Sequence, residues 1–129
     1  MTGGGWSPTG VARAVLAAIA EGRVSDVLAL VDRQVVWMPV TRPALNVYVG
    51  HAGMARMVAD LQAGYGRFRL DAADTGMGVQ AGAGGEVRVT MRVWVVRETA
   101  GGDVAGPSVL AEFTVRGGLV SWVESRYEG

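Results

Sequence analysis

Hydrophobic residues in the first half of the chain recur at helical spacing in three segments. Ser7-Pro8 is a helix-start pattern, so the first segment predicts a helix over residues 8–21, closed by Gly22. Ser25 can cap a second helix, and a third helix is predicted over residues 52–63. The apolar faces of the three helices consist of Val11, Val15 and Ile19, of Val27, Leu28, Leu30 and Val31, and of Met54, Met57, Val58 and Leu61.

The second half of the chain has the composition of strands. Two short strands are predicted over residues 35–38 and 45–49, before and after Pro39. Four long strands, separated by glycine-bearing loops, are predicted over residues 68–75, 86–97, 109–116 and 119–127. The loop at residues 82–85 lacks the lysine and the following helix of a phosphate loop, so it is interpreted as a hairpin loop. The order predicts an α+β domain with helices on one face of a strongly bent antiparallel sheet.

The register of the last two strands follows from their turn. Gly117-Gly118 predicts a two-residue hairpin turn. The expected pairs are Arg116 with Leu119, Val115 with Val120, Phe113 with Trp122, Ala111 with Glu124, and Val109 with Arg126. On this register Phe113 and Trp122 are adjacent core residues, and Glu124 and Arg126 share their inward face.

Length and composition narrow the class of protein. The 129 residues suffice for one domain, predicted over residues 9–129 after a flexible segment of residues 1–8. Half of the residues are apolar and 12 arginines balance 12 carboxylates, which argues against disorder and general nucleic-acid binding. With no cysteine and a single histidine, His51, neither a thiol nucleophile nor a multi-histidine metal site is expected. No apolar run reaches the length of a membrane span, so a soluble, cytoplasmic protein is expected.

Several segments, in this order along the chain, resemble one known superfamily. They are residues 17–31, residues 32–39, the stretch Tyr48-Val49-Gly50-His51 and the ending Arg116-Gly117-Gly118-Leu119-Val120. Over about residues 9–127 the chain resembles the nuclear transport factor 2-like superfamily and, within it, the SnoaL-like group. The resemblance implies a cone-shaped, barrel-like bent antiparallel sheet with three helices on its concave face. That scaffold hosts isomerases, polyketide cyclases, epoxide hydrolases, dehydratases and non-enzymatic binders, so it does not by itself fix a function.

The resemblance assigns chemistry to two positions. SnoaL-like cyclases and limonene-type epoxide hydrolases have a catalytic aspartate on the final strand, and Trp122-Val123-Glu124 matches the hydrolase pattern Trp-x-Asp with glutamate in place of aspartate. The hydrolase pattern Arg-x-Asp falls on Arg92-Val93-Trp94, which keeps the arginine and lacks the aspartate. The polar positions of ketosteroid isomerases fall on Val15, Met38 and Ala111, which excludes that mechanism as it stands. Glu124 and Arg92 are therefore the candidate catalytic residues.

Each of these two residues has a second interpretation. An inward Glu124 acts as a general acid or base, or it forms a structural ion pair with Arg126 or Arg92. Alternation with the neighbouring valines turns Arg92 outward, whereas a bulge or a strong bend turns it inward. The outward arrangement, which the pattern favours, places Arg92 with Arg88 and Trp94 on a surface suited to a homodimer.

Apolar and aromatic residues of the predicted concave face either fill the core or line a ligand pocket. The candidates for such a pocket are Trp37, Met38, Tyr48, Met54, Met57, Phe113 and Trp122, together with His51 and Arg126. His51 opens the third helix, so a role at the helix start competes with proton transfer. The loop over residues 98–108 is long for a hairpin and is a candidate lid.

Two functions from different classes remain. The first is a cofactor-free enzyme that uses general acid–base chemistry, with Glu124 as acid or base. Its reaction is a cyclisation, an isomerisation or an epoxide opening on a small apolar substrate such as a polyketide intermediate. The second is a non-catalytic domain that binds a small molecule or forms a dimer. The expected partners are a small apolar molecule and a second copy of the chain, with no nucleic acid and no membrane.

Overall fold

The computed structural model describes residues 7–39 and 47–127, with the backbone alone for residues 74–77. The helices are α1 (Pro8–Ala20), α2 (Val24–Leu30) and α3 (Gly50–Tyr65), with a short 3-10 turn at Ala83–Gly85. The strands are β1 (Val31–Met38), β2 (Tyr48–Val49), β3 (Phe68–Ala81), β4 (Val87–Thr99), β5 (Gly102–Ala105), β6 (Val109–Arg116) and β7 (Leu119–Tyr127). The α+β class is confirmed. Residues 1–6 of the predicted flexible segment, and the start of the strand predicted at residues 45–49, lie outside the described residues.

The ends of the first helix follow the capping residues of the sequence. The Gly10 N–H donates to Ser7 Oγ at 3.0 Å, which confirms Ser7 as the N-cap of α1. Gly22, with φ of +70°, closes the helix as predicted, and the Arg23 N–H donates back to the Ala18 carbonyl at 2.9 Å. The predicted cap at Ser25 is wrong, because α2 already begins at Val24.

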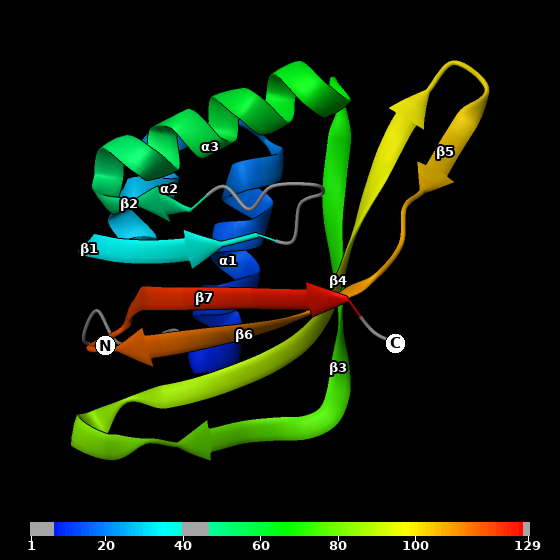
Figure 1. The fold of residues 1–129 in the computed structure, drawn as a ribbon. Coiled ribbons are helices and arrows are strands. Elements are labelled where there is room, and N and C mark those ends of the chain that lie inside the picture. The colour runs from blue at the N-terminus through cyan, green and yellow to red at the C-terminus, as the bar shows by residue number, and fades with distance from the viewer. Residues whose placement is uncertain (1–6, 40–46, 128–129) are drawn as a thin grey trace.

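The sheet has the strand order β2-β1-β7-β6-β4-β3, and β5 pairs with β4 outside this path. All pairs are antiparallel except β1 with β7, which run parallel, so the predicted bent antiparallel sheet is confirmed and contains one parallel pair. Figure 1 shows the sheet curled around α1, with α3 lying across β1 and β2. The parallel pair joins β1, in the first third of the chain, with the last strand, and no local turn pattern specifies it.

The hydrophobic core fills the space between the concave face of the sheet and the helices. Its fully buried side chains are Phe113, Ile19, Met54, Met91, Val15, Val27, Val31, Val35, Val120 and Val123. Trp37 and Phe113 meet edge to face, with ring centroids 5.8 Å apart and planes at 87°. The burial of these side chains confirms the apolar faces predicted for the first and third helices, and the burial of Phe113 confirms it as a core residue of β6.

A bulge in β7 overturns the predicted register of the last hairpin. The turn itself is as predicted: Gly117 and Gly118 have φ of +59° and +78°, and Val115 pairs with Val120. Beyond that pair the register shifts, and Thr114 faces Trp122 instead of Ser121. The extra residue is Ser121, whose hydroxyl donates to the Thr114 carbonyl at 3.3 Å.

The bulge reverses the face of every later residue of β7. Trp122 is 39% exposed, whereas Val123 is fully buried beside Phe113. Glu124 faces Glu112 on the exposed side, and Ser125 takes the predicted place of Glu124 beside Ala111. The prediction that Phe113 and Trp122 are adjacent core residues is therefore wrong, and so is the inward placement of Glu124 and Arg126.

The predicted lid over residues 98–108 contains a strand of its own. β5 pairs with the end of β4 from Val96 with Ala105 to Thr99 with Gly102, and the side chains of β5 are exposed. In Figure 1 this hairpin projects from the body of the domain. An ion pair connects this hairpin to β3, with Arg69 Nη1 lying 2.9 Å from Asp103 Oδ2.

Candidate functional site

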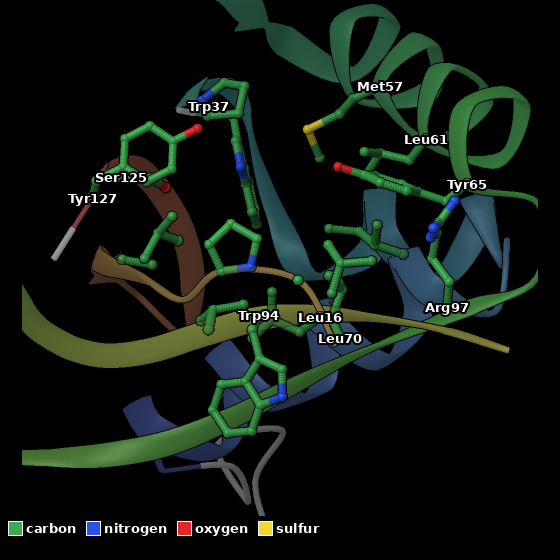
Figure 2. Close-up of a pocket in the computed structure, with 18 of the residues that line it drawn as sticks. Leu16, Trp37, Met57, Leu61, Tyr65, Leu70, Trp94, Arg97, Ser125 and Tyr127 are labelled. Atoms are coloured by element: carbon green, nitrogen blue, oxygen red, sulfur yellow. The ribbon is translucent and has the colours of Figure 1, made fainter. Parts of the chain in front are cut away.

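The concave side of the sheet encloses a cavity of about 330 Å³. Its inner wall consists of buried side chains from α1, α3 and three strands, namely Leu16, Ile19, Trp37, Met57, Val93, Ala111 and Phe113. Its open side consists of more exposed residues, namely Tyr65, Arg97, Val104, Gly106, Pro107 and Tyr127. Figure 2 shows Met57, Leu61 and Tyr65 facing this space from α3, opposite Trp37 and Tyr127. The volume lies at the lower end of the range of about 300–1,000 Å³ for small-molecule sites.

Two small cross-strand partners help to keep this space open. Ala111 of β6 pairs with Ser125 of β7, and both line the cavity. Larger neighbours, Phe113 on one strand and Tyr127 on the other, lie two residues away along the same inward face. A large side chain at the position of Ala111 or Ser125 would occupy the cavity.

The polar groups of the cavity are few. Tyr48 of β2 is buried, and its hydroxyl donates to Asp60 Oδ2 of α3 at 2.7 Å. The guanidinium of Arg56 lies 5.7 Å from the centre of the Tyr48 ring. Among the described residues that line the cavity, none is a carboxylate or a histidine, and Arg97 alone carries a charge.

The structure places four of the predicted pocket residues at the cavity: Trp37, Tyr48, Met57 and Phe113. Met54 is fully buried in the core instead. Met38 pairs with Glu124 and so lies on the outer face of the sheet. His51 Nε2 lies 3.3 Å from the Val31 carbonyl, which can only accept a hydrogen bond, and His51 is not among the residues that line the cavity. The helix-start interpretation of His51 fits this contact.

The residues predicted to carry chemistry lie on the outer face of the sheet. Trp122 Nε1–H donates to Glu124 Oε1 at 2.8 Å, and Glu124 and Arg126 are exposed. Arg92 pairs with Leu110, which in turn pairs with Arg126, so it also lies on the outer face. The outward interpretation of Arg92 is the one that fits this register. None of these four side chains lines the cavity.

The expected dimer surface also changes. The predicted register, which turns Glu124 inward, turns its neighbour Val123 outward, but Val123 is buried in the core. Trp94 borders the cavity and a small hollow shared with Arg13 and Leu16 of α1, rather than standing on an open outer surface. Arg97, Leu61 and Leu70 also line the cavity and were not predicted to do so. For Arg97, the alternation from Val93 through Val95 is a signal in the sequence.

A second hollow, of about 650 Å³, lies beside the C-terminal end of α1 and is lined by charged and exposed residues that include Arg69, Asp71 and Glu98. Two arginines line it, Arg67 and Arg69, and the second is already engaged: Arg69 Nε lies 3.0 Å from Asp71 Oδ1, and the pKa of Arg69 is raised by its hydrogen bonds to Asp103 and then Asp71. The smaller apolar cavity is therefore the better candidate for a ligand. Within the described part of the chain no three acidic, histidine or cysteine side chains gather as a metal site would require.

Comparisons with known proteins agree with this architecture. The model of the SnoaL-like domain family matches residues 12–123. A search of curated proteins found no match. None of the helices in the described residues is long and apolar enough to cross a membrane.

Several solved structures share the fold at low sequence identity. A protein from Thiobacillus denitrificans, provisionally named a calcium/calmodulin-dependent protein kinase type II association domain, is 20% identical, with a TM-score of 0.74 over 96% of this chain and 97% of that one. Aln2 from a Streptomyces species is 12% identical, with a TM-score of 0.75 over 94% and 92%. A provisionally named polyketide cyclase from Pseudomonas putida is 21% identical, with a TM-score of 0.60 over 96% and 93%. At these identities the likeness concerns the fold alone.

Proposed function

This chain belongs to the SnoaL-like domain family, and from that premise we propose that it binds a small, flat and largely apolar molecule in the cavity. One observation carries the proposal: the cavity is lined mainly by apolar and aromatic side chains and lacks an acid or histidine among its described lining residues. Apolar walls with a few convergent polar groups are typical of ligand sites. Met57 and the edge-to-face pair of Trp37 and Phe113 offer a polarizable wall and flat surfaces to an aromatic ring.

A neutral aromatic probe tests this proposal directly. We expect N-phenyl-1-naphthylamine to bind saturably, with rising fluorescence, and to raise the melting temperature. At a hundred times its dissociation constant it should add about 2.7 kcal/mol to the free energy of unfolding. Failure of the wild-type protein to bind this probe, or any similar neutral aromatic compound, contradicts the proposal.

A cavity-filling variant locates the bound probe. Ser125→Trp is expected to abolish binding, because the indole occupies the space beside Ala111. Ala83→Trp, which adds the same side chain at an exposed position of the 3-10 turn, is the matched control and should bind as the wild type does. If Ser125→Trp does not fold, Ala111→Leu is a smaller change on the same wall. Unchanged binding in folded variants of both positions would place the probe elsewhere and overturn the assignment.

A second candidate function is proton transfer within the same cavity, and the Tyr48–Asp60 hydrogen bond favours it. If the α-carbon of a bound ketone gives its proton to the Tyr48 oxygen while Tyr48 passes its own proton to Asp60, the ligand becomes an enolate and the pair gains one proton. Return of that proton to a different ligand atom completes an isomerisation without a cofactor. Two of the solved structures with this fold carry the provisional name polyketide cyclase, which is compatible with chemistry of this type.

The two candidates are separated by one pair of variants. Asp60→Asn keeps the shape of the side chain but removes the proton acceptor, and Tyr48→Phe removes the relay. For an enzyme, both variants are expected to lose turnover of an enolisable aromatic ketone while still binding the neutral probe. For a binding protein, wild type and variants alike bind the probe and give no turnover.

A further inference from the structure

Two arginines on neighbouring strands of the cavity wall differ in what surrounds them. Arg69 of β3 has two carboxylate partners, with Asp71 Oδ1 at 3.0 Å and Asp103 Oδ2 at 2.9 Å. Arg97 of β4 lines the cavity, and no carboxylate in the described part of the chain pairs with it. The cation at the cavity is therefore left without an internal counter-ion, while the one next to it is fully occupied.

The position of Arg97 suits a ligand rather than a structural partner. In the sheet it stands between Phe68 of β3 and Val104 of β5, on the exposed rim of the cavity. Tyr65, 40% exposed at the end of α3, lines the same rim, and its hydroxyl points into the cavity beside Met57 (Figure 2). A partly hydrated guanidinium costs little to keep charged, and its planar donor fork matches a carboxylate.

We infer that the ligand is an apolar carboxylic acid, held with its carboxylate at Arg97 and its apolar body inside the cavity. This inference rests on the proposed binding function and narrows it to a chemical class. The inner wall supplies apolar contacts, so the charged group of an amphipathic ligand finds its partner at the rim alone. In Figure 2 the Tyr65 hydroxyl points toward Met57, at the far end of its ring from Arg97, so the carboxylate is assigned to Arg97 alone.

The experiment compares two molecules that differ in charge and hardly in size. 2-Naphthoate and 2-naphthamide are each used to displace N-phenyl-1-naphthylamine from the protein at neutral pH and low salt, where the acid is ionised. We expect wild-type protein to bind the naphthoate about tenfold more tightly than the amide, the lower end of what a hydrogen bond to a charged group gives. Added salt should reduce this preference and leave the binding of the amide unchanged.

Variants of Arg97 test whether this residue causes the preference for the naphthoate over the amide. Arg97→Gln should remove the tenfold advantage of the naphthoate and leave the affinity for the amide unchanged, and Arg97→Lys should restore part of it. Arg33→Gln, at an exposed arginine of β1 outside the cavity, is the matched control and should behave as the wild type.

The outcomes separate this inference from the proposed function. If the neutral probe does not bind, the proposed function fails. If the probe binds but wild-type protein shows no preference for the naphthoate, or Arg97→Gln retains it, cavity binding stands and the carboxylate inference is overturned.

Discussion

The two faces of the curled sheet carry opposite chemistry on the same strands. On the inner face, β4, β6 and β7 present apolar side chains and the cavity, with one cation at its rim. On the outer face the strands form charged rows: Arg88, Thr114 and Trp122; Thr90, Glu112 and Glu124; and Arg92, Leu110 and Arg126. Two glutamates stand directly opposite each other there, with arginine-bearing rows on both sides. The one carboxylate that the family resemblance singles out, Glu124, thus lies on the side without the cavity.

One inserted residue decides which face of β7 carries the charged side chains. Without Ser121, strict alternation would carry Glu124 and Arg126 to the inner face and Val123 to the outer one. With Ser121 in place, the described residues of β7 bury no charged side chain on the inner face, and Glu124 and Arg126 lie on the outer face. The bulge therefore favours binding over acid–base chemistry in the cavity.

Deletion of Ser121 should have the largest effect, because it reverses the two faces of β7. We expect the variant to unfold or to lose several kcal/mol of stability, since burial of charged side chains and exposure of Val123 would both be required. Urea unfolding followed by circular dichroism measures this loss. Replacement of Ser121 by Ala keeps the residue count and is the control. A deletion variant as stable as the wild type would show that the bulge does not hold the register.

Truncation of an aromatic residue to alanine should lower the free energy of unfolding far more on the inner face than on the outer face. Phe113→Ala is expected to cost about 3–5 kcal/mol, because the ring is fully buried against Trp37. Trp122→Ala, at an exposed ring, is expected to cost about 1 kcal/mol. Chemical denaturation of both variants at one protein concentration gives the difference. Equal losses would contradict the assignment of Trp122 to the outer face.

Association of two copies would use the outer face. We propose a homodimer in which a two-fold axis sets the glutamate row of one copy against an arginine-bearing row of the other, with Trp122 as the apolar anchor. Trp122→Ala should then weaken association by about 2 kcal/mol, as expected for a central tryptophan. Sedimentation equilibrium measures it. A wild-type protein that stays monomeric at high micromolar concentration removes this proposal.

The smallest effect is expected at Glu124. Glu124→Gln keeps a hydrogen-bond acceptor for Trp122 Nε1–H, so the free energy of unfolding should change by about 0.5 kcal/mol or less. The affinity for the neutral probe should not change, because Glu124 lies outside the cavity. Urea unfolding checks the first statement and displacement titration the second, with wild-type protein as the reference. Weakened binding in this variant would place Glu124 in the site after all.

Local patterns made the helices and the last turn predictable. Ser7 and Gly22 act through neighbours within one helical turn, and Gly117-Gly118 closes a hairpin between adjacent residues. Trp37, Tyr48, Met57 and Phe113 were predicted as cavity residues because each belongs to an apolar face of its own element.

The remaining features depend on contacts between distant segments. The parallel pairing joins β1, in the first third of the chain, with β7, its last strand. Arg97 and Tyr65 line the same cavity although they belong to different elements, β4 and α3. The sequence does contain a signal for the bulge. Val120 and Val123 are three residues apart, so both can face the core only if one extra residue lies between them, and that extra residue also keeps Glu124 and Arg126 out of the core. The observed register is favoured because burial of the Glu124 and Arg126 charges would cost more free energy than the formation of one bulge.

The attachment of the β4–β5 hairpin has a consequence for how quickly a bound molecule exchanges. β5 pairs with β4 alone and has no helix over its exposed side chains, yet Val104 belongs to the cavity rim. Opening of this segment breaks four ladder pairs and the Arg69–Asp103 contact while the core of the domain stays packed. The amide hydrogens of residues 102–105 should therefore exchange with solvent far sooner than those of β6. Passage into and out of the cavity can then follow this local fluctuation and need not wait for the domain to unfold.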